Sequence, residues 1–320
     1  MGDAFLTRRG GASLRRLELI SPPDKLRYFA GEYLDMTGTI VGANFGAFTV
    51  PLHDTAWQYS PLRALTASDQ AIQITATLGR LTRQLSVPIA VEDYNTVFSE
   101  NSWNTIARVA AYGIAGQAWN LGDSKTIEVD GTQLEARIVS FIADPLSPND
   151  EKYNDSSYNG NTKRAAMVMQ FFTSPGTAPM HTSASETGWD TCTMRTNVMA
   201  SLYNKLPADL KAAIRLVTKY SFNGRQSRNI TTADRLFLQS EFEVKVPTER
   251  LNREFERDNC ILYDYFNGRA PAHAQQNWTR SMDDAGCTVL NHYFALQANG
   301  NTDLNATYSR ELNYYPMFCL

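Results

Sequence analysis

The chain has 320 residues, of which 43% are hydrophobic and 20% charged, so it is long enough for two or three domains with buried cores. Its formal net charge of −3 and its pI near 5.9 argue against nucleic-acid binding, because proteins of that class concentrate Lys and Arg. The N-terminus lacks the apolar core of a signal peptide, and no apolar run reaches the roughly eighteen residues of a membrane span. We therefore expect no membrane insertion, and synthesis and folding in a cytoplasm.

Residues 1–17 contain two pairs of arginines and a single acidic residue, Asp3, with Gly10 and Gly11 between the pairs. This composition indicates a flexible arm. A disordered terminus and an anchor that docks into a larger particle are both consistent with it. The opening also resembles the starts of many phage structural proteins, which favours the anchor.

Short apolar segments separated by turn residues run from residue 18 to residue 93, a pattern typical of a small β-sandwich. Residues 72–78 alternate between apolar and polar side chains, which is the period of a strand. Residues 28–38 read Tyr-Phe-Ala-Gly-Glu-Tyr-Leu-Asp-Met-Thr-Gly. This stretch resembles the tyrosine-x-x-glycine-glutamate and leucine-aspartate-x-threonine-glycine signature of bacterial immunoglobulin-like domains, which implies a spacer module or, less often, a weak carbohydrate binder.

A predicted helix and hairpin open the last domain, residues 94–320. Apolar residues recur at helical spacing from residue 103 to residue 114, with Ser99 or Asn101 available as the N-cap. Asp130-Gly131 lies between two alternating runs and predicts a two-residue hairpin turn, because Gly accepts the positive φ that such a turn requires.

Further along the chain, residues 144–163 have the composition of a loop and residues 165–172 that of a buried strand. Residues 189–204 carry apolar side chains on one helical face, which indicates core packing rather than a cofactor site. Ser240 and Glu243 have the spacing of a capping box. The charged run at residues 249–258 alternates in sign and is expected to be a solvated surface.

Two motifs near the C-terminus are expected to frame a surface. Residues 277–281 read Asn-Trp-Thr-Arg-Ser, and residues 314–320 read Tyr-Tyr-Pro-Met-Phe-Cys-Leu. Large apolar side chains gain most from burial, whereas the polar residues between the motifs have little reason to leave water. The predicted frame residues are Trp278, Arg280, Pro316 and Phe318.

The residues between the two motifs are rich in Asn, Asp, Tyr, Thr and His, and we predict that residues 282–313 form a ligand-binding face. A polar surface loop that is enriched in Asn by chance is the alternative. The predicted ligand-binding residues are Asp283, Asp284, Asn291, His292, Tyr293, Asn299, Asn301, Asp303, Asn305, Thr307 and Tyr308.

The frame resembles a C-terminal domain of unnamed function in phage and gut-bacterial surface proteins, in which Trp-x-Arg-Ser-Pro precedes a polar loop and the chain closes on Val-Arg-Pro-x-Phe. This chain departs from that pattern at Met282, where relatives carry Pro, and at Tyr314-Tyr315, which replaces Val-Arg. Further matches follow the family's order and extend the resemblance over most of the last domain. They are residues 206–211, 217–219 and 234–244.

That family is in turn similar to the C-type-lectin-like fold used by phage tropism determinants and other targets of diversity-generating retroelements. The resemblance implies a hypervariable face at residues 282–313. The fold class we predict is mainly β plus α+β, with an immunoglobulin-like β-sandwich followed by a C-type-lectin-like α+β domain. The predicted parts are a flexible virion-anchoring arm at 1–17, the β-sandwich at 18–93 and the receptor-binding domain at 94–320.

No motif in the sequence indicates catalysis or a bound metal, so we expect no enzyme activity and no cofactor. The four histidines lack zinc-ligand spacing, and Asp283 and Asp284 are too close along one loop to act as the opposed carboxyls of a glycosidase. Calcium could still bind to Asp and Asn oxygens of the face, as in many lectin-like folds. The four cysteines are expected to be buried free thiols, with a disulfide between Cys260 and Cys287 as the alternative in an oxidising medium.

The leading hypothesis is a virion protein of a phage or prophage that acts as a receptor-binding adhesin for host attachment. Its expected partners are a host cell-surface glycan or protein, other virion proteins through residues 1–17, and further copies of itself in a homotrimer, by analogy with tail fibres. The expected location is the virion, after synthesis in the host cytoplasm. A non-adhesive decoration or baseplate protein is the alternative.

Overall fold

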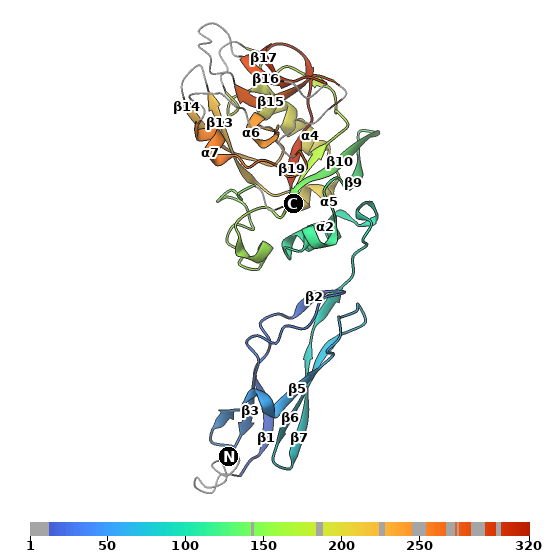
Figure 1. The fold of residues 1–320 in the computed structure, drawn as a ribbon, viewed down its shortest axis with the longest axis vertical. Helices are drawn as coiled ribbons and strands as arrows, with labels where there is room; N and C mark the ends of the chain where they lie inside the picture. The colour runs from blue at the N-terminus through green and yellow to red at the C-terminus, as the bar shows by residue number, and fades with distance from the viewer. Residues whose placement is uncertain are drawn as a thin grey trace. The chain divides into compact units, whose positions relative to one another are not determined.

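The computed structural model describes residues 13–141, 144–183, 188–223, 228–244, 254–266, 273, 275–282, 292–298 and 302–320, except for the side chains of residue 292 and residues 302–306. The chain divides into two compact units, Met1–Tyr94 and Asn95–Leu320. Both are built mainly of β-strands in several small sheets, and most helices belong to the second unit (Figure 1). The predicted β-rich α+β class is therefore confirmed. No helix of the described residues is long and apolar enough to cross a membrane.

The first unit contains two three-stranded sheets, in the orders β1-β3-β4 and β5-β6-β7, and a parallel pair of short strands, β2 and β8. Their apolar faces form one core, to which β1, β3, β6 and β7 contribute fully buried side chains. The elements are β1 (Arg16–Ser21), β2 (Arg27–Phe29), β3 (Ile40–Asn44), β4 (Thr49–Pro51), η1 (Asp54–Ala56), β5 (Trp57–Ser60), β6 (Ala71–Leu78), β7 (Leu81–Pro88) and β8 (Ala90–Glu92).

Strand β6 follows directly from the alternation in its sequence. Ile72, Ile74 and Ala76 are buried, and the polar side chains between them point away from the core. The motif at residues 28–38 forms a turn held by its own side chains. The buried Tyr28 hydroxyl donates to the Lys25 carbonyl (2.9 Å) and accepts from the Asp35 amide (3.2 Å).

The second unit contains a four-stranded sheet in the order β19-β11-β10-β9, a five-stranded sheet in the order β12-β18-β15-β16-β17, and the hairpin β13-β14. Its strands are β9 (Ser124–Val129), β10 (Thr132–Phe141), β11 (Met167–Phe171), β12 (Thr177–Ala178), β13 (Val217–Asn223), β14 (Arg228–Asp234), β15 (Asn277–Met282), β16 (His292–Leu296), β17 (Thr302–Thr307), β18 (Leu312–Asn313) and β19 (Met317–Cys319). Its helices are η2 (Phe98–Glu100), α2 (Trp103–Ala111), α3 (Ala115–Ala118), η3 (Tyr158–Asn161), the π-helix η4 (Met194–Met199), α4 (Ala200–Lys205), α5 (Ala208–Ala213), α6 (Glu241–Val244) and α7 (Glu254–Asn259).

The N-cap of helix α2 lies after both predicted N-caps, one residue beyond Asn101 and three beyond Ser99. Ser102 is the N-cap, and its hydroxyl accepts from the Thr105 amide at 3.1 Å. Asn101 does not cap the helix, because its side-chain oxygen accepts from the Asn95 amide at 2.8 Å and its side-chain nitrogen donates to the carbonyls of Asn95 and Val97. The predicted hairpin turn is confirmed between β9 and β10, where Asp130 and Gly131 have φ values of 50° and 78°.

The C-terminal strand β19 lies at the edge of the four-stranded sheet and joins it to the opening helix. Phe318 packs edge-on against Trp103 of α2 and at a tilt against Phe171 of β11, with ring centroids 6.2 and 5.7 Å apart. An isolated bridge between Phe237 and Met317 fixes β19 to the segment before α6. Trp278 and Phe318 are both fully buried, as the sequence predicted, so both motifs of the frame contribute to the interior of the second unit.

We expect residues 95–320 to fold without the first unit, because the opening helix, both sheets and the closing strand share this core. The purified fragment should unfold cooperatively in urea and keep its near-ultraviolet circular dichroism. A fragment without a cooperative transition would contradict this division of the chain.

In the same fragment Trp278→Ala should lower the free energy of unfolding by about 3–5 kcal/mol, the usual effect of truncating a buried large aromatic.

Candidate binding face

The segment predicted to bind ligand, residues 282–313, begins and ends in the same five-stranded sheet. It starts at the end of β15 and returns to the sheet at β18, where Asn313 is the parallel partner of Asn277. Between these points β16 and β17 pair antiparallel, with His292 opposite Thr307. Figure 1 shows β15, β16 and β17 side by side at one end of the second unit, away from α2 and α5.

Few of the predicted ligand-binding side chains fall within the described part of the chain. Thr307 and Tyr308 are partly exposed at the end of β17. Three more residues lie in β16 or β17 with side chains outside the description, namely His292, Asp303 and Asn305. Outside the described residues altogether lie Asp283, Asp284, Asn291, Asn299 and Asn301.

The prediction that Tyr293 belongs to the exposed face is wrong. Tyr293 is 0% exposed, and its hydroxyl lies 2.6 Å from Nε2 of the buried His181. Its ring packs edge-on against Trp278, with centroids 6.3 Å apart. Tyr293 is therefore a core residue, since Trp278 and His181 cover its ring and the histidine satisfies its hydroxyl.

Tyr308 lies over this buried aromatic cluster. Its ring meets the His181 ring edge-on at 6.0 Å, and its carbonyl accepts from the Met180 amide at 2.9 Å. His181 therefore links the buried Tyr293 to the partly exposed Tyr308. The sequence drew attention to His181 only as an isolated histidine, because its two tyrosine partners are more than a hundred residues away.

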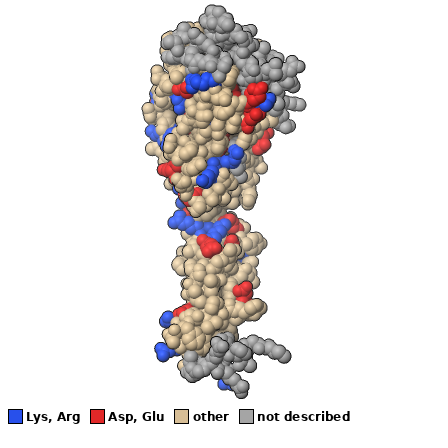
Figure 2. Space-filling model, turned by 90° about the vertical axis from the view of Figure 1, so that its left-hand side faces the viewer, with Lys and Arg blue, Asp and Glu red and all other residues tan. Residues whose placement is uncertain are grey.

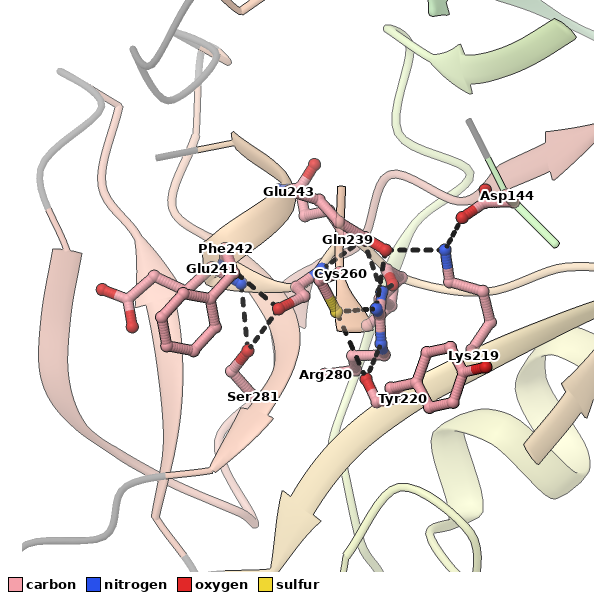
Figure 3. Close-up of polar contacts among 12 residues, drawn as sticks. Asp144, Lys219, Tyr220, Gln239, Glu241, Phe242, Glu243, Cys260, Arg280 and Ser281 are labelled. Atoms are coloured by element: carbon pink, nitrogen blue, oxygen red, sulfur yellow. Dashed lines mark hydrogen bonds and ion pairs between the residues drawn. The ribbon is translucent and has the colours of Figure 1, made fainter. Parts of the chain in front are cut away.

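A closed network of buried charged side chains includes Arg280 of β15, the strand that leads into residues 282–313 (Figure 3). The guanidinium grips Glu243 of α6 with two hydrogen bonds, Nη1 to Oε2 at 2.6 Å and Nη2 to Oε1 at 2.7 Å. Nη1 also donates to the Leu238 carbonyl and Nε to the Tyr220 carbonyl of β13. A planar fork on a carboxylate is the geometry that Arg favours in buried sites.

Lys219 of β13 extends the network on the other side of Glu243. Its Nζ lies 2.6 Å from Oε1 of Glu243, 2.6 Å from Oδ1 of Asp144 and 2.9 Å from the Tyr263 hydroxyl. The Tyr263 hydroxyl donates in turn to Oδ2 of Asp144 at 2.9 Å. The ammonium also lies over the Phe237 ring, 4.1 Å from its centroid.

Charges in this network balance, which is why they can be buried. Burial opposes ionisation of Glu243, but Arg280 and Lys219 outweigh it and hold the pKa of that carboxyl well below its usual range. Burial likewise opposes the charge on Lys219, but Asp144 and Glu243 outweigh it and raise the pKa of the amine. Two cations therefore face two anions out of contact with water.

A second carboxylate anchors β15 from another direction. Glu256 of α7 is 0% exposed and accepts from the hydroxyls of Ser240 and Ser281. Ser281 also accepts from the Glu241 amide at 3.0 Å. The prediction that residues 249–258 form a solvated surface is therefore wrong at Glu256, whose carboxylate accepts from two serine hydroxyls inside the protein. The predicted capping box is confirmed, since Glu243 Oε2 accepts from the Ser240 amide at 2.8 Å.

Cys192 and Cys319 are buried free thiols, as predicted, whereas Cys287 lies outside the described residues. Within the described part of the chain no cluster of His, Cys, Asp or Glu is placed to hold a metal ion. The adjacent pair Asp283 and Asp284 falls outside that part, so calcium binding at the face stays a prediction.

Residues 153–320 match a protein family described as a domain of unknown function (DUF6273). The matched region contains both motifs of the frame and three members of the network, Lys219, Glu243 and Arg280, but it begins after Asp144. No curated protein matches the chain.

Replacing Arg280 with Met should destabilise the protein by about 3–5 kcal/mol, because the change leaves a buried carboxylate without its main partner. The matched control is Arg257→Met, which removes a pair with Asp258 whose side chains are 51% and 60% exposed. That change should cost less than about 1 kcal/mol. Urea unfolding of both variants measures the two losses of unfolding free energy. Equal losses would mean that the buried Arg280 pair stabilises the protein no more than an exposed pair does.

Acid should destabilise the second unit through His273 before the carboxylates titrate. His273 stacks on Tyr315 with centroids 3.6 Å apart, and burial, aided by Arg137, lowers its pKa from 6.5 to about 3. The unfolded chain therefore binds more protons than the folded one below pH 6.5, so stability falls as the pH falls, by up to about 1.4 kcal/mol per pH unit.

His273→Phe keeps a stacking ring without a titrating group. Unfolding measured between pH 6.5 and pH 4.5, above the range in which Glu243 titrates, should show a shallower loss of stability in the variant than in the parent. Identical pH profiles would show that His273 is accessible to protons in the folded state.

Proposed function

The chain belongs to the DUF6273 family, and on the evidence of its buried frame we propose that this member is a receptor-binding adhesin of a phage or prophage virion. Residues 282–313 of the second unit would contact the host. The first unit would be an immunoglobulin-like spacer, the second a C-type-lectin-like domain, and residues 1–17 the anchor to other virion proteins.

The observation that carries this proposal is the way in which the face is held. The strand that leads into it, β15, is fixed on one side by Arg280 to Glu243 and on another by Ser281 to Glu256. The chain leaves this strand at residue 282 and returns beside it at residue 313. Both ends of a long polar segment are thereby attached to a rigid core.

A rigid frame favours recognition because a preorganised surface loses less conformational freedom when it binds. Binding residues are commonly placed on loops that a stable scaffold positions. Tyr308 fits such a role, since a tyrosine offers a large contact area with few rotatable bonds, and its ring already rests against His181.

The mechanism would be binding without a chemical step. Figure 2 shows one side of the molecule, on which Lys and Arg side chains are interspersed with Asp and Glu among uncharged residues. A host glycan or surface protein would be the target, and a homotrimer would raise the effective concentration of individually weak sites. The resemblance to retroelement targets makes hypervariability of the face part of this proposal.

The second candidate is a decoration or baseplate protein whose second unit packs only against neighbouring virion proteins. A rigid frame would suit this role equally well. Surface labelling of intact particles distinguishes the two candidate functions. Residues 282–313 would be accessible in an adhesin and protected in a decoration or baseplate protein.

Tyr308→Ala should abolish or redirect adsorption of the purified protein to host cells, with a loss of about 2 kcal/mol or more in binding free energy. The matched variant Tyr293→Phe removes only the hydroxyl bonded to His181, so it should lower the free energy of unfolding by about 1 kcal/mol and leave adsorption unchanged. Adsorption across a panel of bacterial strains and melting temperature are measured for both. If Tyr308→Ala adsorbs like the parent, this face does not bind the host.

A further inference from the structure

The ion pair between Lys219 and Asp144 includes a third polar group, the hydroxyl of Tyr263, which an ion pair alone does not need. The three polar groups contact one another in a ring, with distances of 2.6 Å from Nζ to Oδ1, 2.9 Å from Nζ to the tyrosine oxygen and 2.9 Å from that oxygen to Oδ2. Glu243 then approaches the same Nζ at 2.6 Å (Figure 3). All four side chains are buried.

The distances place the amine within reach of the carboxyl carbon. A carbonyl C–O bond is about 1.23 Å long. Because Nζ lies 2.6 Å from Oδ1, it can be no farther than roughly 3.8 Å from Cγ of Asp144. Such proximity, held by a rigid core, is what makes reactions between two bound groups fast.

We propose that Lys219 and Asp144 join through an intramolecular amide bond between Nζ and Cγ. In this reaction the ammonium and carboxylate become one neutral amide, and one molecule of water leaves. The network loses one positive and one negative charge together, so the remaining pair, Arg280 and Glu243, stays balanced.

The neighbouring groups are placed to move the protons. The Glu243 carboxylate accepts a proton from Nζ at 2.6 Å, which frees the lone pair of the amine. The Tyr263 hydroxyl points its proton at Oδ2, the oxygen that leaves. Nζ attacks Cγ, the bond from Cγ to Oδ2 breaks, and this oxygen departs as water with the two protons lost by the ammonium. Glu243 and Tyr263 end the reaction in the states in which they began.

Burial favours the amide over the ion pair. In water the two ions are well hydrated, whereas here both have lost their hydration and are held only by one another and by their neighbours. Replacing them by a neutral amide removes two buried charges. In the ion-paired state the pKa of the amine is raised and that of Glu243 is lowered, so proton transfer from Nζ to Glu243 is the uphill step of the reaction.

Such a bond would tie the segment after β10 to β13 across 75 positions of the chain. It would strengthen the frame under the face by limiting the unfolded state, as a disulfide does, and it does not depend on what the face binds.

The test is the mass of the intact, denatured full-length protein. The expected mass is that of the sequence minus one water, with a proteolytic fragment in which the peptides containing Asp144 and Lys219 are joined. In Asp144→Asn the expected loss is one ammonia, because nitrogen then leaves in place of oxygen. Loss of water from this variant would place the bond elsewhere and overturn the proposal.

Controls come from an exposed pair of the same residue types. Lys205 and Asp130 lie 2.8 Å apart, with side chains 48% and 64% exposed, so Lys205→Met should still show the loss of one water. Lys219→Met should show the full sequence mass, and Tyr263→Phe should leave a fraction of chains unjoined. A parent protein at its full sequence mass, or a loss of water that persists in Lys219→Met, would refute the bond. The measurement on the parent decides the question even if a variant fails to fold.

Discussion

The ion pair between Arg280 and Glu243 is the constraint on which the second unit depends, because a strand, a helix and a hairpin converge on it. Arg280 belongs to β15, Glu243 to α6, and the Arg280 Nε binds a carbonyl of β13. Burying two charges is unfavourable unless they are closely paired. The three elements therefore cannot shift independently, which fixes β15, the middle strand of the five-stranded sheet, at the point where residues 282–313 depart.

A cluster of aromatic side chains connects β15 to the partly exposed Tyr308. Trp278 lies in the same strand as Arg280, two residues earlier. Tyr293 packs on Trp278, and its hydroxyl is hydrogen-bonded to His181. The Tyr308 ring meets the same His181 edge-on. Contacts with a buried histidine thus hold one partly exposed tyrosine in place, and this arrangement suits a molecule that recognises its partner by contact alone.

Sequence patterns were sufficient where structure is local. Strand β6 and the Asp130-Gly131 turn were both predictable, because residues that are neighbours along the chain determine them. The boundary expected before residue 94 lies beside the division into two compact units after Tyr94. Both motifs of the frame were predicted to be buried from the size of Trp278 and Phe318 alone.

The sequence by itself thus determined the β-rich class, the strands and turns with a clear period, and the apolar ends of the frame. Only the tertiary structure decided that Tyr293 is core, that Glu256 is buried and that Lys219 meets Asp144. The physical reason is the same in each case. A polar or charged residue can enter the interior only when a partner satisfies it, and that partner is supplied by a distant part of the chain that no local pattern identifies.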